Sequence, residues 1–136
     1  MKKLFILILT AVLVAASLFG CSISKEDKDK VKDLEFTVVE DAEVPEELMK
    51  LIEAKKQSMF KLTYTNDQAL YIVVGYGKQE TGGYSISVNE LFLTDNSIVI
   101  KTNLIGPSKE ETPTSEPSFP YVVVKTELNE HPVIFQ

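Results

Sequence analysis

Apolar residues in the second half of this chain recur with the period of β-strands, and this pattern constrains the fold more than any other feature. Residues 59–64 and 70–76 are runs rich in β-branched and aromatic residues, with turn-forming residues between them. Tyr84, Ile86 and Val88 then alternate with polar residues, which indicates a strand with one buried face. We therefore predict a sheet of consecutive antiparallel strands.

The alternation changes phase once. After Val88, the apolar residues Leu91 and Leu93 fall on odd positions. Because strand side chains repeat every two residues, a bulge or bend near 89–90 is needed to keep both sets on the buried face. A hairpin turn is predicted at 94–97. Further strands are predicted at 34–39, 98–104 and 121–126, with a short edge strand at 132–135.

One amphipathic helix is predicted over 45–57. Pro45 suits a first helical turn, and Leu48, Leu51 and Ile52 share one face at helical spacing. The predicted fold class is α+β, a small antiparallel β-sheet or partly closed barrel with this helix packed on it.

The first twenty residues have the pattern of a secretory signal peptide. Lys2 and Lys3 precede an apolar run that ends at Gly20, directly before Cys21, the single cysteine of the chain. A small residue before this cysteine resembles a bacterial lipobox, so we expect Cys21 to carry lipid and to attach the protein to the extracytoplasmic face of the cell membrane. The competing interpretation is an uncleaved membrane anchor, for which the run is just long enough.

The residues after Cys21 predict a tether. Residues 22–33 mix charges of both signs and contain little to bury. A basic membrane-contact patch is the rival interpretation, but the acidic residues nearly cancel the lysines. The predicted organisation is a signal peptide at 1–20, a lipidated cysteine and charged tether at 21–33, and a single domain at 34–136.

Composition excludes several function classes. The net charge is -6, and removal of residues 1–20, which hold two lysines and no acid, makes it -8. The chain has no arginine, so nucleic acid is not an expected partner. With Cys21 lipidated, no thiol remains for a disulfide or a metal site. Acidic residues cluster at 40–47, but helix-end electrostatics explains them better than a calcium site does, and no metal or cofactor is predicted.

The sequence does not predict an enzyme. His131 is the single histidine and stands apart from any serine and acid arrangement, which argues against a Ser–His–Asp triad. A dyad of Lys78 with Thr81 or Ser85 is conceivable, but a solvated lysine is the simpler interpretation.

Residues 75–84, GYGKQETGGY, raise three interpretations. A phosphate loop fails because Gln79 follows Gly77-Lys78 and Ile72 stands where the first glycine is needed. A simple turn is the second interpretation, with Gly82 and Gly83 supplying positive φ angles. The third is a partner surface of uncovered backbone between two tyrosines. Its candidate residues are Tyr76, Lys78, Gln79, Glu80, Thr81, Gly82, Gly83 and Tyr84.

Three segments together resemble the PrcB C-terminal domain family. They are GYGK at 75–78, TGGYSI at 81–86, and PYVVVK at 120–125 after a proline-bearing loop, and the likeness covers roughly 58–127. One departure is the absence of a glutamine in the loop at 113–118, which reads PTSEPS. If this loop contacts the partner, the departure implies a different partner.

The resemblance implies a function as well as a fold. The family takes its name from a lipoprotein subunit of a surface protease complex, a subunit that supports the protease and is not itself the peptidase. We therefore expect a membrane-anchored, non-catalytic accessory subunit that binds an extracytoplasmic protein such as a protease. The alternative is a small-ligand or cell-envelope-binding module. A ligand module should show a concave pocket lined by aromatic residues, and a partner subunit a flat or protruding patch near Tyr76 and Tyr84.

Overall fold

The computed structural model describes residues 30–110, 112 and 114–136. The predicted signal peptide, Cys21 and most of the predicted tether lie outside these residues. No helix in the described part of the chain is long and apolar enough to cross a membrane.

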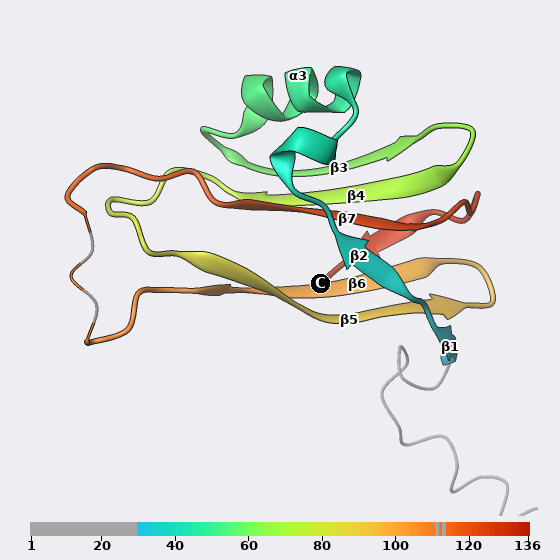
Figure 1. The fold of residues 1–136 in the computed structure, drawn as a ribbon. Coiled ribbons are helices and arrows are strands. Elements are labelled where there is room, and N and C mark those ends of the chain that lie inside the picture. Colours follow the sequence, from blue (N-terminus) through green and yellow to red (C-terminus); the bar gives the residue numbers. More distant parts are fainter. Residues whose placement is uncertain (1–29, 111, 113) are drawn as a thin grey trace, which may run out of the picture. The chain divides into compact units, whose positions relative to one another are not determined.

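Two four-stranded sheets lie face to face, and one α-helix covers the outer face of the second sheet (Figure 1). Sheet A has the strand order β1-β5-β6-β8, and sheet B has the order β2-β7-β4-β3. The strands are β1 (Lys30–Asp33), β2 (Phe36–Val38), β3 (Met59–Thr65), β4 (Ala69–Tyr76), β5 (Ser85–Thr94), β6 (Ile98–Ile105), β7 (Tyr121–Glu127) and β8 (Val133–Phe135). A 3-10 turn, η2 (Asp41–Glu43), precedes helix α3 (Glu46–Lys55).

The predicted β-rich fold with one amphipathic helix is confirmed for the described residues, but the predicted single sheet or partly closed barrel is wrong. The strands form two sheets, and neither closes into a barrel. The predicted antiparallel arrangement also fails at β8, which pairs with β6 in parallel. The reason for two sheets lies in β4, where every residue from Ala69 to Val74 is buried. A strand buried on both faces needs a layer on each side, and here sheet A supplies one layer and the helix the other.

The two faces of sheet B contribute to two separate cores. Ile72 and Val124 face sheet A, where they pack with Leu91, Ile98 and Ile100. Alternate residues on the other face pack against the helix; they are Ala69, Tyr71, Val73 and Val123. Each fully buried aliphatic side chain contributes on the order of 1.5–3 kcal/mol, so the stacking of the three layers is the main source of stability.

The predicted helix is confirmed, with one difference on its face. Leu48 and Ile52 are completely buried, whereas Leu51 is 40% exposed. Pro45 occupies the position just before the first helical residue. The buried stripe of this short helix is therefore narrower than the sequence pattern predicts.

The phase change in β5 is a bulge. Val88 pairs with Thr102, but the next paired residue, Glu90, lies opposite Lys101, so one residue of β5 has no counterpart in β6. The bulge near 89–90 is therefore confirmed. The predicted hairpin at 94–97 also forms, with the Thr94 N–H donating to the Ser97 carbonyl oxygen at 2.8 Å.

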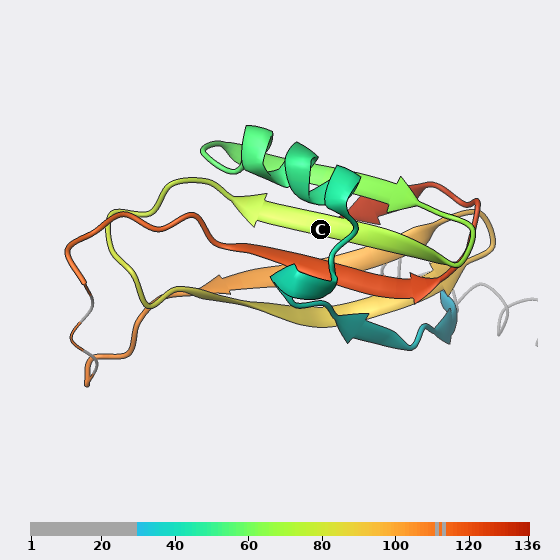
Figure 2. The ribbon, with the colours of Figure 1, turned by 45° about the horizontal axis from the view of Figure 1, so that its top comes forward.

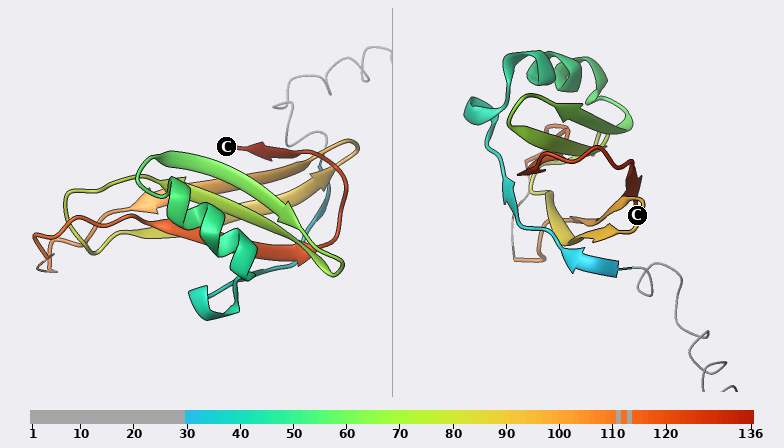
Figure 3. Two further views of the ribbon diagram at one scale, coloured as in Figure 1. Left: turned by 90° about the horizontal axis from the view of Figure 1, so that it is seen from above. Right: turned by 90° about the vertical axis from the view of Figure 1, so that its right-hand side faces the viewer.

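The N-terminal end of the described chain differs from the prediction. Residues 30–33, expected in the tether, form β1 beside β5, and the Leu34 N–H donates to the Leu91 carbonyl oxygen at 2.9 Å. The chain then crosses to the other sheet, where β2 pairs with β7 (Figures 2 and 3). Charged side chains indicated solvent exposure correctly, but an edge strand can pair through its backbone while all its side chains stay exposed.

Candidate partner-binding surface

Two loops meet at one end of the sandwich, at the left of Figures 1 and 2. One loop, 77–84, joins β4 to β5, and the other, 106–120, joins β6 to β7. Gln79 and Ser118 exchange two backbone hydrogen bonds of 2.8 and 3.0 Å. The Ser118 hydroxyl also donates to the Thr81 carbonyl oxygen at 2.6 Å. We call residues 77–84 and 106–120 together the loop end, because the hydrogen bonds join them into one surface.

The glycines of the first loop are required at their positions for different reasons. Gly83 has a φ of 87° and Gly77 a φ of 74°, a backbone conformation that favours glycine. The positive φ predicted for Gly83 is confirmed, whereas that for Gly82 is wrong. A Cβ on Gly82 would instead lie 2.7 Å from the Thr114 hydroxyl oxygen. Glycine at position 82 therefore lets the second loop approach.

The candidate residues divide between the tip and the base of the first loop. Lys78, Glu80 and Gly83 are exposed, while Gln79, Thr81 and Gly82 are half-buried under contacts with the second loop. The tip therefore presents charged groups and glycine backbone rather than an aromatic patch.

Both tyrosines that flank the stretch are half-buried at its base. The Tyr76 hydroxyl lies 2.6 Å from the Thr102 hydroxyl of β6, so Tyr76 links sheet B to sheet A. The ring of Tyr84 lies beside Gly106 at the start of the second loop, where a Cβ on Gly106 would be 3.5 Å from the ring. Strand alternation places Tyr76 at the rim of the core, but nothing in the sequence indicates its hydroxyl partner.

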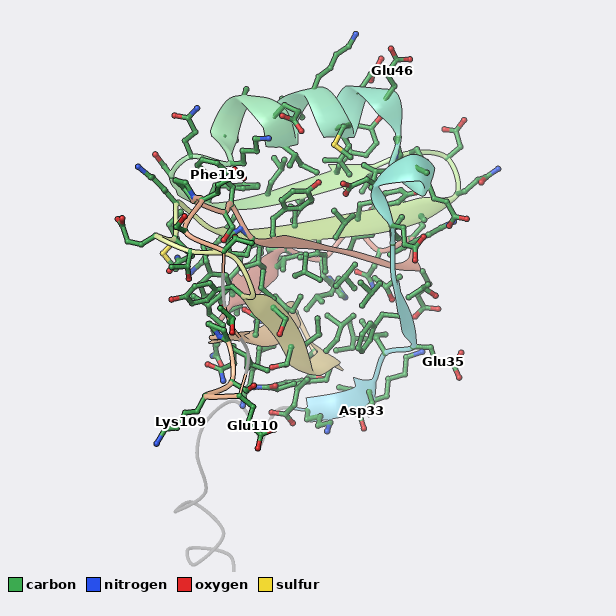
Figure 4. The ribbon with its side chains drawn as sticks, turned by 60° about the vertical axis from the view of Figure 1, so that its left-hand side comes forward. Asp33, Glu35, Glu46, Lys109, Glu110 and Phe119 are labelled. Atoms are coloured by element: carbon green, nitrogen blue, oxygen red, sulfur yellow. The ribbon has the colours of Figure 1, made fainter. Side chains whose placement is uncertain are left out.

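A third segment, the turn between α3 and β3, supports the loop end. The Lys78 N–H donates to the Gln57 carbonyl oxygen at 3.3 Å, and the Lys56 ammonium lies 5.8 Å from the centre of the Phe119 ring. Figure 4 turns this end forward and shows Phe119 near the helix and Lys109 at the opposite side of the end. Sequence patterns did not indicate Lys56 or Phe119, because no motif contains them.

The loop end carries charges of both signs with a small acidic excess, two lysines against four glutamates in the sequence. Its exposed ionisable residues in the described chain are Lys78, Glu80, Lys109, Glu110 and Glu116. A surface of this kind is expected to recognise shape and backbone groups more than charge, because its long-range field is weak.

Two residues of the acidic cluster accept hydrogen bonds from tyrosines. Asp41 accepts from the Tyr121 hydroxyl at 2.6 Å, and Glu47 accepts from the Tyr64 hydroxyl at 3.3 Å. Burial, together with Asp41, raises the pKa of Tyr121 far above its usual value. Burial and Glu47 also raise the pKa of Tyr64. Among the described residues, no group of three or more histidine, cysteine or acidic side chains is arranged to hold a metal ion.

The candidate catalytic residues do not come together in the described part of the chain. His131 is exposed, and its backbone N–H donates to the Asn129 side chain at 2.8 Å. Thr81 donates its hydroxyl to the Gly82 carbonyl oxygen at 3.2 Å, and no hydrogen bond joins the described Lys78 side chain to Thr81 or Ser85.

Two hollows of different character occur in the described chain. An open groove of about 1050 Å³ runs beside the segment that crosses from β1 to β2. Phe36 is the single aromatic residue among its lining residues, and charged residues such as Lys32, Glu43 and Lys125 line much of it. The second hollow is about 120 Å³ and contains Tyr76 and Phe135. The larger hollow therefore lacks the aromatic lining expected of a ligand module.

Strands β4 to β7 and both loops of the loop end lie within residues 70–127, and this segment matches the family model described as PrcB C-terminal. Residues 70–127 are similar to the PrcB C-terminal family, and we call this segment the PrcB C-terminal region. The resemblance recognised in the sequence is thereby confirmed over most of its expected range of 58–127. The PrcB C-terminal region includes the central strands of both sheets, whereas α3 and the outer strands lie outside it. No curated protein and no solved structure that was compared with the chain matches it.

Proposed function

We propose that this protein is a non-catalytic accessory subunit that binds an extracytoplasmic partner protein through the loop end. The observation that carries the proposal is the joining of the two loops by the Gln79–Ser118 backbone bridge within the PrcB C-terminal region. These loops are the largest part of that region that does not belong to the strands.

The loop end is suited to recognition because hydrogen bonds join residues 79–82 to residues 114–118 before binding. Four prolines in 106–120 and the hydrogen bonds to Gln79 and Thr81 restrict its conformations. A surface ordered in advance loses less conformational entropy on association than a flexible one does. Exposed glycine backbone at Gly83 leaves peptide groups available to a partner.

The partner we propose is a protease of the cell surface, which the protein would support without cleaving peptides itself. This part of the proposal follows from the PrcB C-terminal resemblance. The dispersed positions of His131 and Lys78 agree with a non-catalytic role.

Attachment to the cell membrane through lipid on Cys21 completes the proposal. Replacement of Cys21 by alanine should abolish incorporation of labelled palmitate and release the protein from the membrane fraction. Palmitate incorporation by C21A at the wild-type level would overturn the lipoprotein assignment and leave the uncleaved anchor.

The partner proposal is tested by co-purification from native membranes followed by mass spectrometry. The test variant changes Lys78, Gln79 and Glu80 to alanine, and a second variant changes Ser108, Lys109 and Glu110 to alanine. The matched control changes three exposed residues in turns at the other end of the sandwich, Asp67, Gln68 and Asp95.

We expect both loop variants to keep the melting temperature of the parent protein, because exposed tip residues contribute little to stability, and to lose the same partner. The control triple variant should retain that partner. Retention of all partners by both loop variants would contradict a recognition role for the loop end and leave 77–84 as a turn.

A further inference from the structure

Strand β3 forms one edge of sheet B, and no strand of the described chain pairs with its outer side. The Asn66 N–H donates to the Ala69 carbonyl oxygen across the β3–β4 turn, and the Tyr76 N–H donates to the Pro120 carbonyl oxygen on the other side of β4. Since alternate residues of an antiparallel strand direct both backbone groups to the same neighbour, odd residues of β4 face β3 and even residues face β7. The register of β3 with β4 then directs the N–H and C=O of Lys61 and Thr63 away from the sheet.

Met59, Lys61 and Thr63 have exposed side chains on the face of sheet B that is turned toward sheet A. Lys61 lies opposite Val74 and Met59 opposite Tyr76, on the face that packs against sheet A elsewhere. Sheet A ends on this side with β8, which has three residues (Figure 3). Met59 is 62% exposed on this face.

A hollow opens beside this edge. It measures about 120 Å³, and its walls combine the apolar residues Met59, Val74, Ile100 and Phe135 with Lys61, Tyr76, Thr102 and Gln136. The Lys61 ammonium lies 5.7 Å from the centre of the Phe135 ring. Within the described residues Lys61 forms no ion pair with a carboxylate. The edge therefore combines a row of peptide groups, a hollow with an apolar part, and a lysine that forms no ion pair among the described residues.

We propose that the β3 edge binds an extended segment of a partner polypeptide, which adds to sheet B as a further strand. An apolar side chain of that segment enters the hollow, and an acidic side chain two or more residues away pairs with Lys61. The alternating N–H and C=O groups of Lys61 and Thr63 are complemented by another extended polypeptide and not by a small ligand. The Lys61 ammonium, which forms no ion pair with a described carboxylate, favours an acidic segment.

The other sheet edges are less suited to this role. The edge strands β1, β2 and β8 have four, three and three residues, whereas β3 has seven. Proteins usually keep exposed edges short to prevent unwanted pairing. The long edge at β3 lies outside the PrcB C-terminal region, so this surface is separate from the loop end.

The test uses the full chain in detergent and a library of displayed random peptides of about ten residues, enough to pair along the whole strand. Peptides selected on the parent protein are measured against two variants and two controls. T63P removes an outward N–H that the edge needs, and V38P removes the outward N–H of the opposite edge, β2. K61E reverses the proposed selecting charge, and K125E reverses an exposed lysine on the other face of sheet B.

We expect selected peptides to alternate apolar and polar residues and to carry an aspartate or glutamate. They should lose at least about tenfold in affinity with T63P and with K61E but not with the controls, and they should slow hydrogen exchange of the Lys61 and Thr63 amides about tenfold or more. The Lys78, Gln79 and Glu80 triple variant should bind them as the parent does, which separates this site from the loop end.

Failure to select any peptide would overturn the proposal. So would selected peptides that leave the exchange of the Lys61 and Thr63 amides unchanged. A concentration-dependent dimer that T63P abolishes would show that a second copy of the chain occupies the edge, and would replace the proposed partner segment. If T63P does not fold, K61E and the exchange measurement on the parent protein decide the question.

Discussion

At the residue scale, the two adjacent glycines of the loop end have different functions. Gly83 needs its freedom of φ, because L-residues rarely adopt 87°. Gly82 needs its lack of a side chain, because the Thr114 hydroxyl occupies the space of a Cβ. One constraint belongs to the backbone of a single residue and the other to a contact between two loops, so the two positions should respond differently to changes at Thr114.

Replacement of Gly83 by alanine should lower the free energy of unfolding by about 1 kcal/mol or more, both in the parent and in a T114A background. Gly82→Ala should also destabilise the parent but cost clearly less in T114A, where the obstructing hydroxyl is absent. Urea unfolding of the single and double variants gives the cost of each glycine replacement with and without the Thr114 hydroxyl. An equal cost of Gly82→Ala in the two backgrounds would contradict the close-approach explanation.

Tyr121 should make stability depend on pH in the alkaline range. The pKa of a tyrosine in an unfolded chain is about 10, whereas burial and Asp41 raise the pKa of Tyr121 in the folded protein. The folded state therefore holds the proton longer, and its stabilisation is complete below about pH 10 and lost as the pH rises toward the folded pKa.

Unfolding free energies measured between neutral and strongly alkaline pH should fall less steeply in Y121F than in the parent. Y121F should also be less stable at neutral pH, because it lacks the hydrogen bond to Asp41. Part of the pH dependence of stability that remains in Y121F is due to Tyr64, whose pKa is raised by burial and Glu47. If the unfolding free energies of Y121F and the parent protein fall equally with pH, the alkaline loss of stability is not due to Tyr121.

At the element scale, local pattern predicted the strands well and their partners poorly. The β5 bulge and the hairpin at 94–97 follow from neighbouring residues, since the phase of alternation and turn chemistry are local properties. The pairing of β1 with β5 depends on a distant strand, and its charged side chains give no signal of it. The loop end is another such case: Ser118 and Thr81 are bonded although they are 37 positions apart, and neither loop shows this in its own composition.

The hydroxyl contact between Tyr76 of β4 and Thr102 of β6 should contribute to holding the two sheets together. We expect Tyr76→Phe and Thr102→Val to show a coupling free energy of about 0.5–1.5 kcal/mol in a double-mutant cycle. Tyr76→Phe combined with Thr65→Val, a pair without contact, serves as the control and should be additive. Additivity of the Tyr76 and Thr102 changes would mean that the contact does not stabilise the sandwich.

At the scale of the whole molecule, the crossing segment at 30–44 joins both sheets and the helix. It places β1 in sheet A and β2 in sheet B, and then leads into α3. The sequence indicated a domain beginning at 34 because apolar residues begin there, and it could not show that residues 30–33 add a strand through backbone pairing. The two-sheet arrangement was missed for a related reason, since alternation defines the faces of a strand but not how many sheets the strands form.

A chain of residues 30–136 should unfold at a higher urea concentration than one of residues 34–136, by about 1 kcal/mol or more of unfolding free energy. Both should be mostly β by circular dichroism and unaffected by a chelator. Loss of β1 removes the pairing along the outer edge of β5 while the Leu34–Leu91 hydrogen bond is retained. Equal midpoints for the two chains would show that β1 contributes nothing to the fold.

The positions of β1 and the loop end have a mechanical consequence. β1 lies beside the part of β5 near Leu91, away from Ser85, where β5 leaves the loop end (Figure 1). A pull between Val31 and a partner held at the loop end therefore acts along the length of the strands. Hydrogen bonds between strands run across that direction, so tension loads the short ladders of β1 and β2 in shear, with the bonds of each ladder sharing the force, rather than separating them one at a time.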